Sequence, residues 1–307
     1  MARRRRFRGR DVNGVLLLDK PSGITSNAAL QQAKRLFNAA KAGHTGSLDP
    51  LASGMLPICF GEATKISAYL LSADKHYRAV CKLGVNTSSG DADGEVTQIR
   101  PVQGVDEARV REVLMEFTGT IQQVPPMHSA IKRDGVPLYK LAHQGIEVER
   151  EAREVHILAL DLLRLDGDEM EIQVHCSKGT YIRTLAEEIG EALGCGAHIT
   201  ALRRTGVGAL DGERLHSLAS LEAVVEERGR HHLDELLLPI DSTLPDWPQV
   251  RLSEDASFYI RQGQPVFVPQ LKERGLVRLY AGETRFLGLG TVLDDGRVAP
   301  KRLLNIP

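Results

Sequence analysis

The chain has 307 residues, of which 42% are hydrophobic and 26% charged, so it can bury a core without disulfides or metals. No apolar run reaches the roughly 18 residues of a membrane span, no secretory signal pattern follows the basic start, and the four cysteines form no zinc-binding pair. Charge is uneven, because residues 1–50 carry ten Lys or Arg against three Asp, whereas residues 211–250 carry three Arg against nine acids. We therefore expect a cytoplasmic protein, without membrane or metal, whose basic start can meet phosphates.

The first elements predicted along the chain are a strand, a helix and a loop. Residues 14–20, GVLLLDK, read as a short buried strand that Pro21 ends. Helical spacing of apolar residues predicts a helix over 25–37, with Ser26 or Asn27 as its cap. The loop GHTGSLDPLASG follows at 43–54, and its glycines and proline let neither helix nor strand continue easily.

The middle of the chain predicts helices over 61–71 and 105–118, the second ended by Gly119. Between them, strands over 77–85 and 95–100 form a hairpin with a long tip. The tip matches the early positions of an EF-hand calcium loop. Because Arg100 stands where the bidentate Glu is required, a polar turn is the better interpretation than a calcium site.

The remaining chain predicts an exposed insertion, two strands, a helix and a small second module. Residues 122–150 are too rich in turn and basic residues for a buried element, and strands follow over 154–165 and 170–177. A helix is expected over 179–194, with Thr180 as its cap. A proline-rich linker ends near Pro248, before a β-rich module. Hairpins and scattered helices without a βα repeat predict an α+β fold with a largely antiparallel mixed sheet and flanking helices.

Several segments, in chain order, resemble the bacterial tRNA pseudouridine synthases of the TruB family, which act on uridine 55 in the T loop. The resemblance implies a basic tail (1–13), a catalytic domain (14–248) with an RNA-gripping insertion (122–150), and a PUA-like RNA-binding domain (249–307). It also implies a monomer that needs no cofactor. The segments are GVLLLDKPSGITS, AGHTGSLDPLASGMLPICFGEATK, DKHYRAVCKLG, HCSKGTYIRTLAEEIGEALGCGAH and LRRTGVG.

The resemblance also assigns roles to single residues. Asp49 matches the nucleophile that detaches uracil from its ribose, and Arg183 matches its ion-pair partner. Tyr77 matches a residue that stacks on the target base and is a candidate base for a ribose proton. The remaining matches are substrate contacts: His44 under a flipped-out nucleotide, Tyr181, the backbone around Leu202, and Lys20, whose Lys-Pro motif is expected mainly to support the active-site loop.

The chemistry agrees with a carboxylate as the functional group. Isomerising a glycosidic bond involves no redox change, and a carboxylate can form a covalent adduct without a metal. The target base lies inside folded tRNA, so the enzyme must extrude it and hold the T arm by its phosphates. Lys132, Arg133 and Lys140 of the insertion are the candidates for that grip.

Two questions stay open at the level of sequence. Asp49 can attack either C1′ of the ribose or C6 of the uracil ring. A non-catalytic RNA-binding or tRNA-folding protein is the alternative function, because a basic tail and a PUA-like module suit it equally well. Intact Asp49, Tyr77 and Arg183 favour the enzyme.

Overall fold

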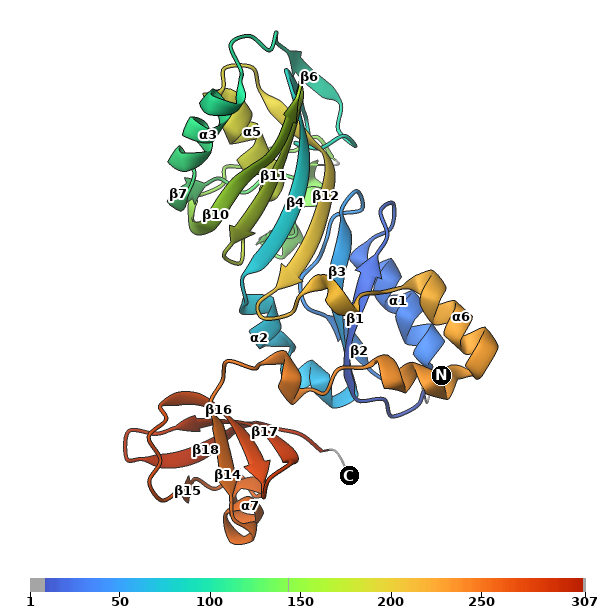
Figure 1. Cartoon of the computed structure of the whole chain (residues 1–307), viewed down its shortest axis with the longest axis vertical. Helices are drawn as coiled ribbons and strands as arrows, with labels where there is room; N and C mark the ends of the chain where they lie inside the picture. Colours follow the sequence, from blue (N-terminus) through green and yellow to red (C-terminus); the bar gives the residue numbers. More distant parts are fainter. Residues whose placement is uncertain (1–8, 143, 306–307) are drawn as a thin grey trace.

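The computed structural model describes residues 9–142 and 144–305; residues 1–8, which hold most of the expected basic tail, lie outside this part of the chain. Within it, the chain forms a mixed α+β structure with one nine-stranded and one five-stranded sheet (Figure 1). The expected fold class is confirmed. No helix in the described part is long and apolar enough to cross a membrane.

The nine-stranded sheet has the order β13-β1-β3-β12-β4-β11-β10-β7, with β2 paired to β3. Most neighbours run antiparallel, whereas β1 with β13 and β3 with β12 run parallel. The short β3–β12 pairing joins the two halves of the sheet seen in Figure 1. The strands are β1 (Gly14–Lys20), β2 (Ala42–His44), β3 (Ser53–Phe60), β4 (Lys75–Leu83), β7 (Gly119–Gln123), β10 (Arg153–Asp166), β11 (Glu169–Cys176), β12 (Ala197–Val207) and β13 (His216–Ser217).

Helices cover one face of each half of this sheet (Figure 1). In one half, α3 (Glu107–Glu116) and α5 (Ile182–Ala192) bury their apolar stripes against β4, β10, β11 and β12. In the other, α1 (Ser26–Phe37) and α6 (Leu218–Arg228) pack on β1 and β3. The four cysteines, all in described positions, are free and buried.

Three expected helix ends are wrong, because local hydrogen bonds or the next strand take their place. Thr25 caps α1 by accepting from the Ala28 N–H, while the Ser26 hydroxyl is turned toward the loop at 45–52. Thr180 donates to the Ser177 carbonyl and does not cap α5. Gly119, at φ 103°, begins β7 and does not end α3.

Two other predicted elements are divided in the structure. The expected helix over 61–71 is a 3-10 helix (Gly61–Lys65) followed by α2 (Ser67–Ser72). The expected strand over 77–85 is β4 followed by the separate strand β5 (Val85–Thr87), and β5 forms the hairpin with β6 (Val96–Ile99). The tip of that hairpin is the expected polar turn, in which Asp91 accepts from the Ser89 hydroxyl.

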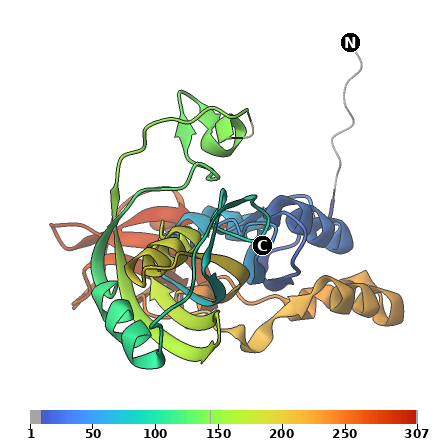
Figure 2. The ribbon, with the colours of Figure 1, turned by 90° about the horizontal axis from the view of Figure 1, so that it is seen from above.

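The expected insertion at 122–150 has different bounds in the structure, because residues 122–123 belong to β7: the chain leaves the sheet after Gln123 and returns at Arg153, where β10 begins. It holds β8 (Lys132–Arg133), β9 (Val136–Pro137) and α4 (Leu138–Ala142). Figure 2 shows it projecting from the body on two extended segments. Its sequence lacks an apolar face large enough to fold onto the sheet, so it stays outside the core.

The five-stranded sheet has the order β14-β16-β17-β18-β15 and its own apolar core. Arg278 of β16 donates to the carbonyls of Asp241, Pro245 and Trp247, which fixes the preceding linker. Lys65 donates to the Leu303 carbonyl, so this sheet also contacts the 3-10 helix at Gly61–Lys65. The elements of this module are β14 (Gln249–Leu252), α7 (Glu254–Arg261), β15 (Val266–Phe267), β16 (Gly275–Ala281), β17 (Arg285–Val292) and β18 (Arg297–Leu303). Before the module, the chain forms 3-10 helices at Gly212–Arg214, Arg230–Leu236 and Asp241–Thr243.

Candidate active site

The loop that carries Asp49 connects β2 to β3 and is fixed from beneath. The Ser26 hydroxyl both accepts from the Leu48 N–H at 2.7 Å and donates to the Leu48 carbonyl at 2.9 Å. Where the loop enters β3, Gly54 has φ 97°, and a side chain there would meet the Arg204 carbonyl at 2.3 Å. Glycine is therefore required for the close approach of β3 to β12.

Lys20 lies under the same loop and is completely buried. Its ammonium donates to the carbonyls of Pro21 at 2.8 Å, Ile24 at 2.7 Å and Pro50 at 3.4 Å. Burial lowers its pKa to about 8. The Lys20 side chain has no exposed surface and lies behind the loop, which is the position expected of a residue that mainly supports it.

Arg183, in the first turn of α5, lies beside the Asp49 carboxylate. Its Nε is 3.0 Å from Asp49 Oδ2. The same guanidinium donates to the carbonyls of Ser89 at 2.9 Å and His128 at 2.7 Å, and its Nη1 is 3.5 Å from Asp91 Oδ2. Arg183 is only 6% exposed. These contacts fix its orientation and compensate a buried positive charge, which would otherwise destabilise the fold.

Asp91 is a second carboxylate in this site that the sequence analysis placed in a polar turn. It is 5% exposed, is bonded to Ser89, and lies 3.5 Å from Arg183 Nη1, whereas Asp49 pairs with Arg183 Nε. The polar turn that the sequence predicts is present, and Asp91 accepts a hydrogen bond within it. What the motif could not show is that β5 and β6 bring the turn against α5.

The pKa of the Asp49 carboxyl is raised above its ordinary value. Burial is the largest cause, and the like charge of Asp91 acts in the same direction. Arg183 opposes both as a charge and as a hydrogen-bond donor, and Lys20 opposes them more weakly. The Asp49 side chain is nevertheless 45% exposed. It therefore presents a carboxylate of increased basicity to an open cleft.

A cleft of about 350 Å³ lies in front of Asp49. Tyr77 from β4, Leu202 from β12 and Tyr181 from the start of α5 line it together with Asp49 and Arg183. The cleft can hold a planar base between aromatic and aliphatic walls. Burial raises the pKa of the Tyr77 phenol, against the opposing effect of Arg204, so Tyr77 is a neutral phenol at pH 7.

Arg204 and Lys75 are cleft residues that the sequence analysis missed. Arg204 is 1% exposed and donates to the carbonyls of Met55 at 2.8 Å and Gly46 at 3.1 Å. Lys75 donates to carbonyls of the α2 end, and burial lowers its pKa to about 8. Arg204 lies in the LRRTGVG segment and Lys75 in the DKHYRAVCKLG segment, so membership in these segments was the available signal for both.

His44 lies on β2, outside the set of residues that line the cleft. Burial, and then the charge of Arg204, lower the pKa of its imidazole, so the ring is neutral at pH 7. Among the described residues its buried Nδ1 has no hydrogen-bond partner. The structure thus supplies an uncharged ring, which suits stacking better than phosphate binding.

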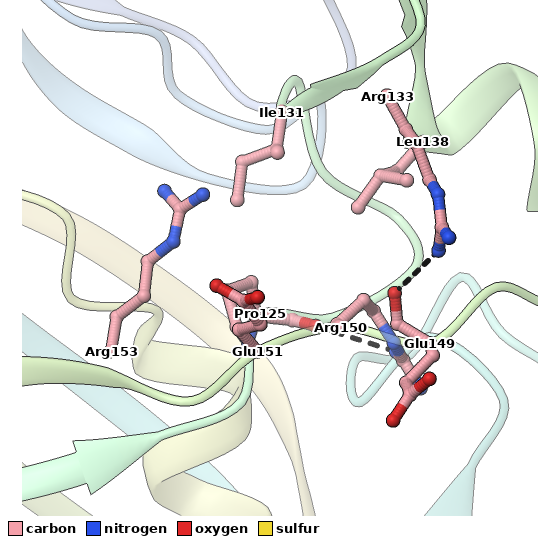
Figure 3. A pocket seen from close by; sticks show the side chains of 8 residues that line it. All are labelled: Pro125, Ile131, Arg133, Leu138, Glu149, Arg150, Glu151 and Arg153. Carbon is pink, nitrogen blue, oxygen red and sulfur yellow. Dashed lines mark hydrogen bonds between the residues drawn. The ribbon is translucent and has the colours of Figure 1, made fainter.

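The basic residues expected to grip RNA, Lys132, Arg133 and Lys140, are all exposed on the insertion. Arg133 donates to the Glu149 carbonyl across a hollow of about 440 Å³ at the base of the insertion (Figure 3). Figure 3 shows the Arg153 guanidinium projecting into this hollow. The hollow shares no lining residue with the Asp49 cleft. In the part of the chain that the structure describes, no group of three or more His, Cys, Asp or Glu is placed to hold a metal.

Family models match consecutive parts of the chain. The model described as "TruB family pseudouridylate synthase (N terminal domain)" matches residues 34–182. "tRNA pseudouridylate synthase B C-terminal domain" matches residues 183–245, and "Pseudouridine synthase II TruB, C-terminal" matches residues 248–304. Together they follow the chain almost from α1 to β18.

Relatives match over nearly the full length. The tRNA pseudouridine synthase B of Nitrosococcus oceani is 55% identical over 304 residues, which cover 99% of this chain and 98% of that protein. The tRNA pseudouridine synthase B of Ectopseudomonas mendocina is 56% identical over 99% of both chains.

Solved structures share the fold at lower identity. One described as "Crystal Structure of a Cbf5-Nop10-Gar1 Complex" is 28% identical with a TM-score of 0.72, over 96% of this chain and 84% of that one. "Structure of H/ACA RNP bound to a substrate RNA containing 2'-deoxyuridine" is 26% identical with a TM-score of 0.73, over 96% and 85%.

Proposed function

The chain belongs to the TruB family of tRNA pseudouridine synthases, and from that premise we propose that it isomerises uridine 55 in the T loop of tRNA to pseudouridine. The observation that carries the proposal is the Arg183–Asp49 pair at 3.0 Å, at the mouth of a cleft with aromatic walls. An open carboxylate of raised pKa beside a buried cation suits nucleophilic attack on a neutral nucleoside.

In the proposed reaction, a carboxylate oxygen of Asp49 forms a bond to C1′ of the ribose or to C6 of the uracil. The N1–C1′ bond breaks, the uracil turns, and a C5–C1′ bond forms. The proton on C5 leaves, N1 gains a proton, and Asp49 is released as a carboxylate. Product and substrate are isomers, so the balance requires no external oxidant or reductant.

The walls of the cleft give the other residues their proposed roles. Tyr77 stacks on the flipped uracil, and Tyr181 and Leu202 close the cleft around it. Its raised pKa leaves little Tyr77 phenolate to accept a proton at pH 7. We therefore assign Tyr77 to stacking in preference to proton transfer. His44, as a neutral ring outside the cleft, is assigned to stack under a flipped-out nucleotide.

Recognition of the T arm is proposed for the exposed insertion and the C-terminal sheet. Lys132, Arg133 and Lys140 offer cations on a projecting arm, where phosphates can reach them. Residues 249–307 carry nine Lys or Arg against six acids, so this module also favours a polyanion. We propose that the enzyme acts as a monomer in the cytoplasm, where its tRNA substrate is found.

Tritium release from a T-arm transcript labelled at C5 of its uridines tests the proposed function, because isomerisation removes that hydrogen. We expect one equivalent released per transcript with EDTA present. Binding without release would support the alternative of a tRNA-folding protein. Release that EDTA abolishes and a metal restores, with the RNA fold intact, would contradict metal-free catalysis.

A further inference from the structure

The first turn of α5 carries Tyr181 and Arg183, yet its start lacks the usual cap. Among the described residues, no side chain caps this helix at Tyr181, because Thr180 is bonded to the Ser177 carbonyl. Helix starts without a cap fray readily. The Arg183 guanidinium is held by Ser89, His128 and Asp91, but the main chain at Tyr181 requires a contact of another kind to stay in place.

That contact comes from Gln123, the last residue of β7. Its side-chain Oε1 accepts from the Tyr181 N–H at 2.7 Å, and its Nε2 donates to the Tyr181 carbonyl at 3.1 Å. Gln123 is 1% exposed. A buried amide that is bonded to both the N–H and the C=O of one residue fixes that residue in position and in rotation.

We propose that Gln123 is a positioning residue for the reaction, holding the main chain at Tyr181 so that Arg183 meets Asp49 at bonding distance. This inference rests on the proposed function. Gln123 contacts the backbone of α5 and reaches neither the cleft nor Asp49, so its effect passes through Arg183.

The place of Gln123 also connects the insertion to the nucleophile. The insertion begins at the next residue, and Arg153, where it returns, is the cross-strand partner of Gln123. Within the insertion, the His128 carbonyl accepts from Arg183 at 2.7 Å. The end of β7 and the insertion thus contact the start of α5 at two residues, Gln123 at Tyr181 and His128 at Arg183.

The test compares Gln123→Met, which keeps length and volume but removes both hydrogen bonds, with Gln122→Met on the same strand. Gln122 is exposed and serves as the matched control. Single-turnover tritium release at saturating enzyme reports the chemical step, and filter binding reports affinity for the same T-arm RNA. A misplacement of about 1 Å costs on the order of 100-fold, so we expect Gln123→Met to be about 10- to 100-fold slower, with affinity within threefold of wild type.

Gln123→Glu provides a readout that a packing role alone would not move. A protonated Glu presents the same donor and acceptor as Gln, whereas its anion cannot donate to the Tyr181 carbonyl. Burial favours the protonated form at mildly acid pH. The charged groups that act on the neighbouring Tyr181 are Arg153, Arg183 and Asp49, and all remain in every variant.

The rate of Gln123→Glu relative to wild type should therefore rise at least about fivefold between pH 8 and pH 5.5. A constant ratio would overturn the proposal, as would Gln123→Met within twofold of the wild-type rate, or a loss of binding equal to the loss of rate. Wild-type turnover in the same assay tests the proposed function itself, so failure of one is distinguishable from failure of the other. If Gln123→Met does not fold, the pH dependence of the Gln123→Glu rate still tests the proposal.

Discussion

Arg183 Nε lies 3.0 Å from Asp49 Oδ2, and the same guanidinium is held by the main-chain carbonyls of Ser89 and His128. The pair therefore differs from a surface salt bridge, whose long side chains are free to separate. Two segments that are distant from α5 in sequence hold Arg183, and Asp49 of a supported loop pairs with it.

Replacement of Arg183 should be severe. Arg183→Met leaves the raised-pKa Asp49 without its main counter-charge, and it leaves Asp91 buried beside a methionine. We expect single-turnover tritium release to fall by at least two orders of magnitude. Arg183→Lys, which keeps a charge but cannot reach all four acceptors, should recover only part of the loss. A Met variant near the wild-type rate would show that the pair is not needed for chemistry.

Replacement of Lys20 should affect the fold more than RNA binding. Lys20→Met removes the donor to three carbonyls beneath the catalytic loop and should lower the melting temperature. Because Lys20 is completely buried, the slope of log Kd against log salt for tRNA should not change. A smaller slope would show that Lys20 reaches a phosphate.

The exposed lysines of the insertion should behave in the opposite way. Lys132→Gln and Lys140→Gln should each reduce the salt slope by about 0.7 to 0.9 if each neutralises one phosphate. Thermal stability should be unchanged, since neither side chain is buried. Unchanged slopes in both variants would mean that the insertion does not hold the RNA backbone.

The pH dependence of the chemical step should follow Asp49. The carboxyl must be ionised to attack, so the rate falls as pH falls through its pKa, which burial and Asp91 place above the ordinary value. Asp91→Asn removes the like charge and should shift this acid limb to lower pH. Single-turnover rates between pH 4.5 and 8 measure the shift. A limb that moves upward or stays in place would contradict the charge assignment.

The sequence predicted the motif-bearing parts of the site because each motif is local. The loop around Asp49, the start of α5 and β4 each carry their residues in one continuous stretch, and helix and strand periodicity placed those stretches in the fold. The α+β class likewise followed from the alternation of hairpins and helices.

The remaining parts depend on contacts between segments that are distant in sequence. Asp91 matters because a hairpin tip lies against α5, and Gln123 because β7 ends beside Tyr181. Lys20 is expected from its motif to support the loop, but only the structure shows that the loop covers it completely. Thr180 has the composition of a cap, but its hydroxyl finds the nearer Ser177 carbonyl.

The central claim is that Asp49 is the nucleophile, and its two conservative variants test it together. Asp49→Asn keeps the shape but cannot form the adduct, and Arg183 retains the acceptors Ser89, His128 and Asp91, so the fold should persist. Asp49→Glu keeps the charge but moves the carboxylate by about a bond length, enough to lose a near-attack geometry.

The most direct measurement is filter binding and tritium release from T-arm RNA on the same preparations of wild type, Asp49→Asn and Asp49→Glu. We predict affinity within a few-fold of wild type for both variants, and no appreciable turnover by either. A substantially active Asn variant would contradict the nucleophile assignment, and parallel loss of binding and turnover would show that Asp49 serves the structure of its loop.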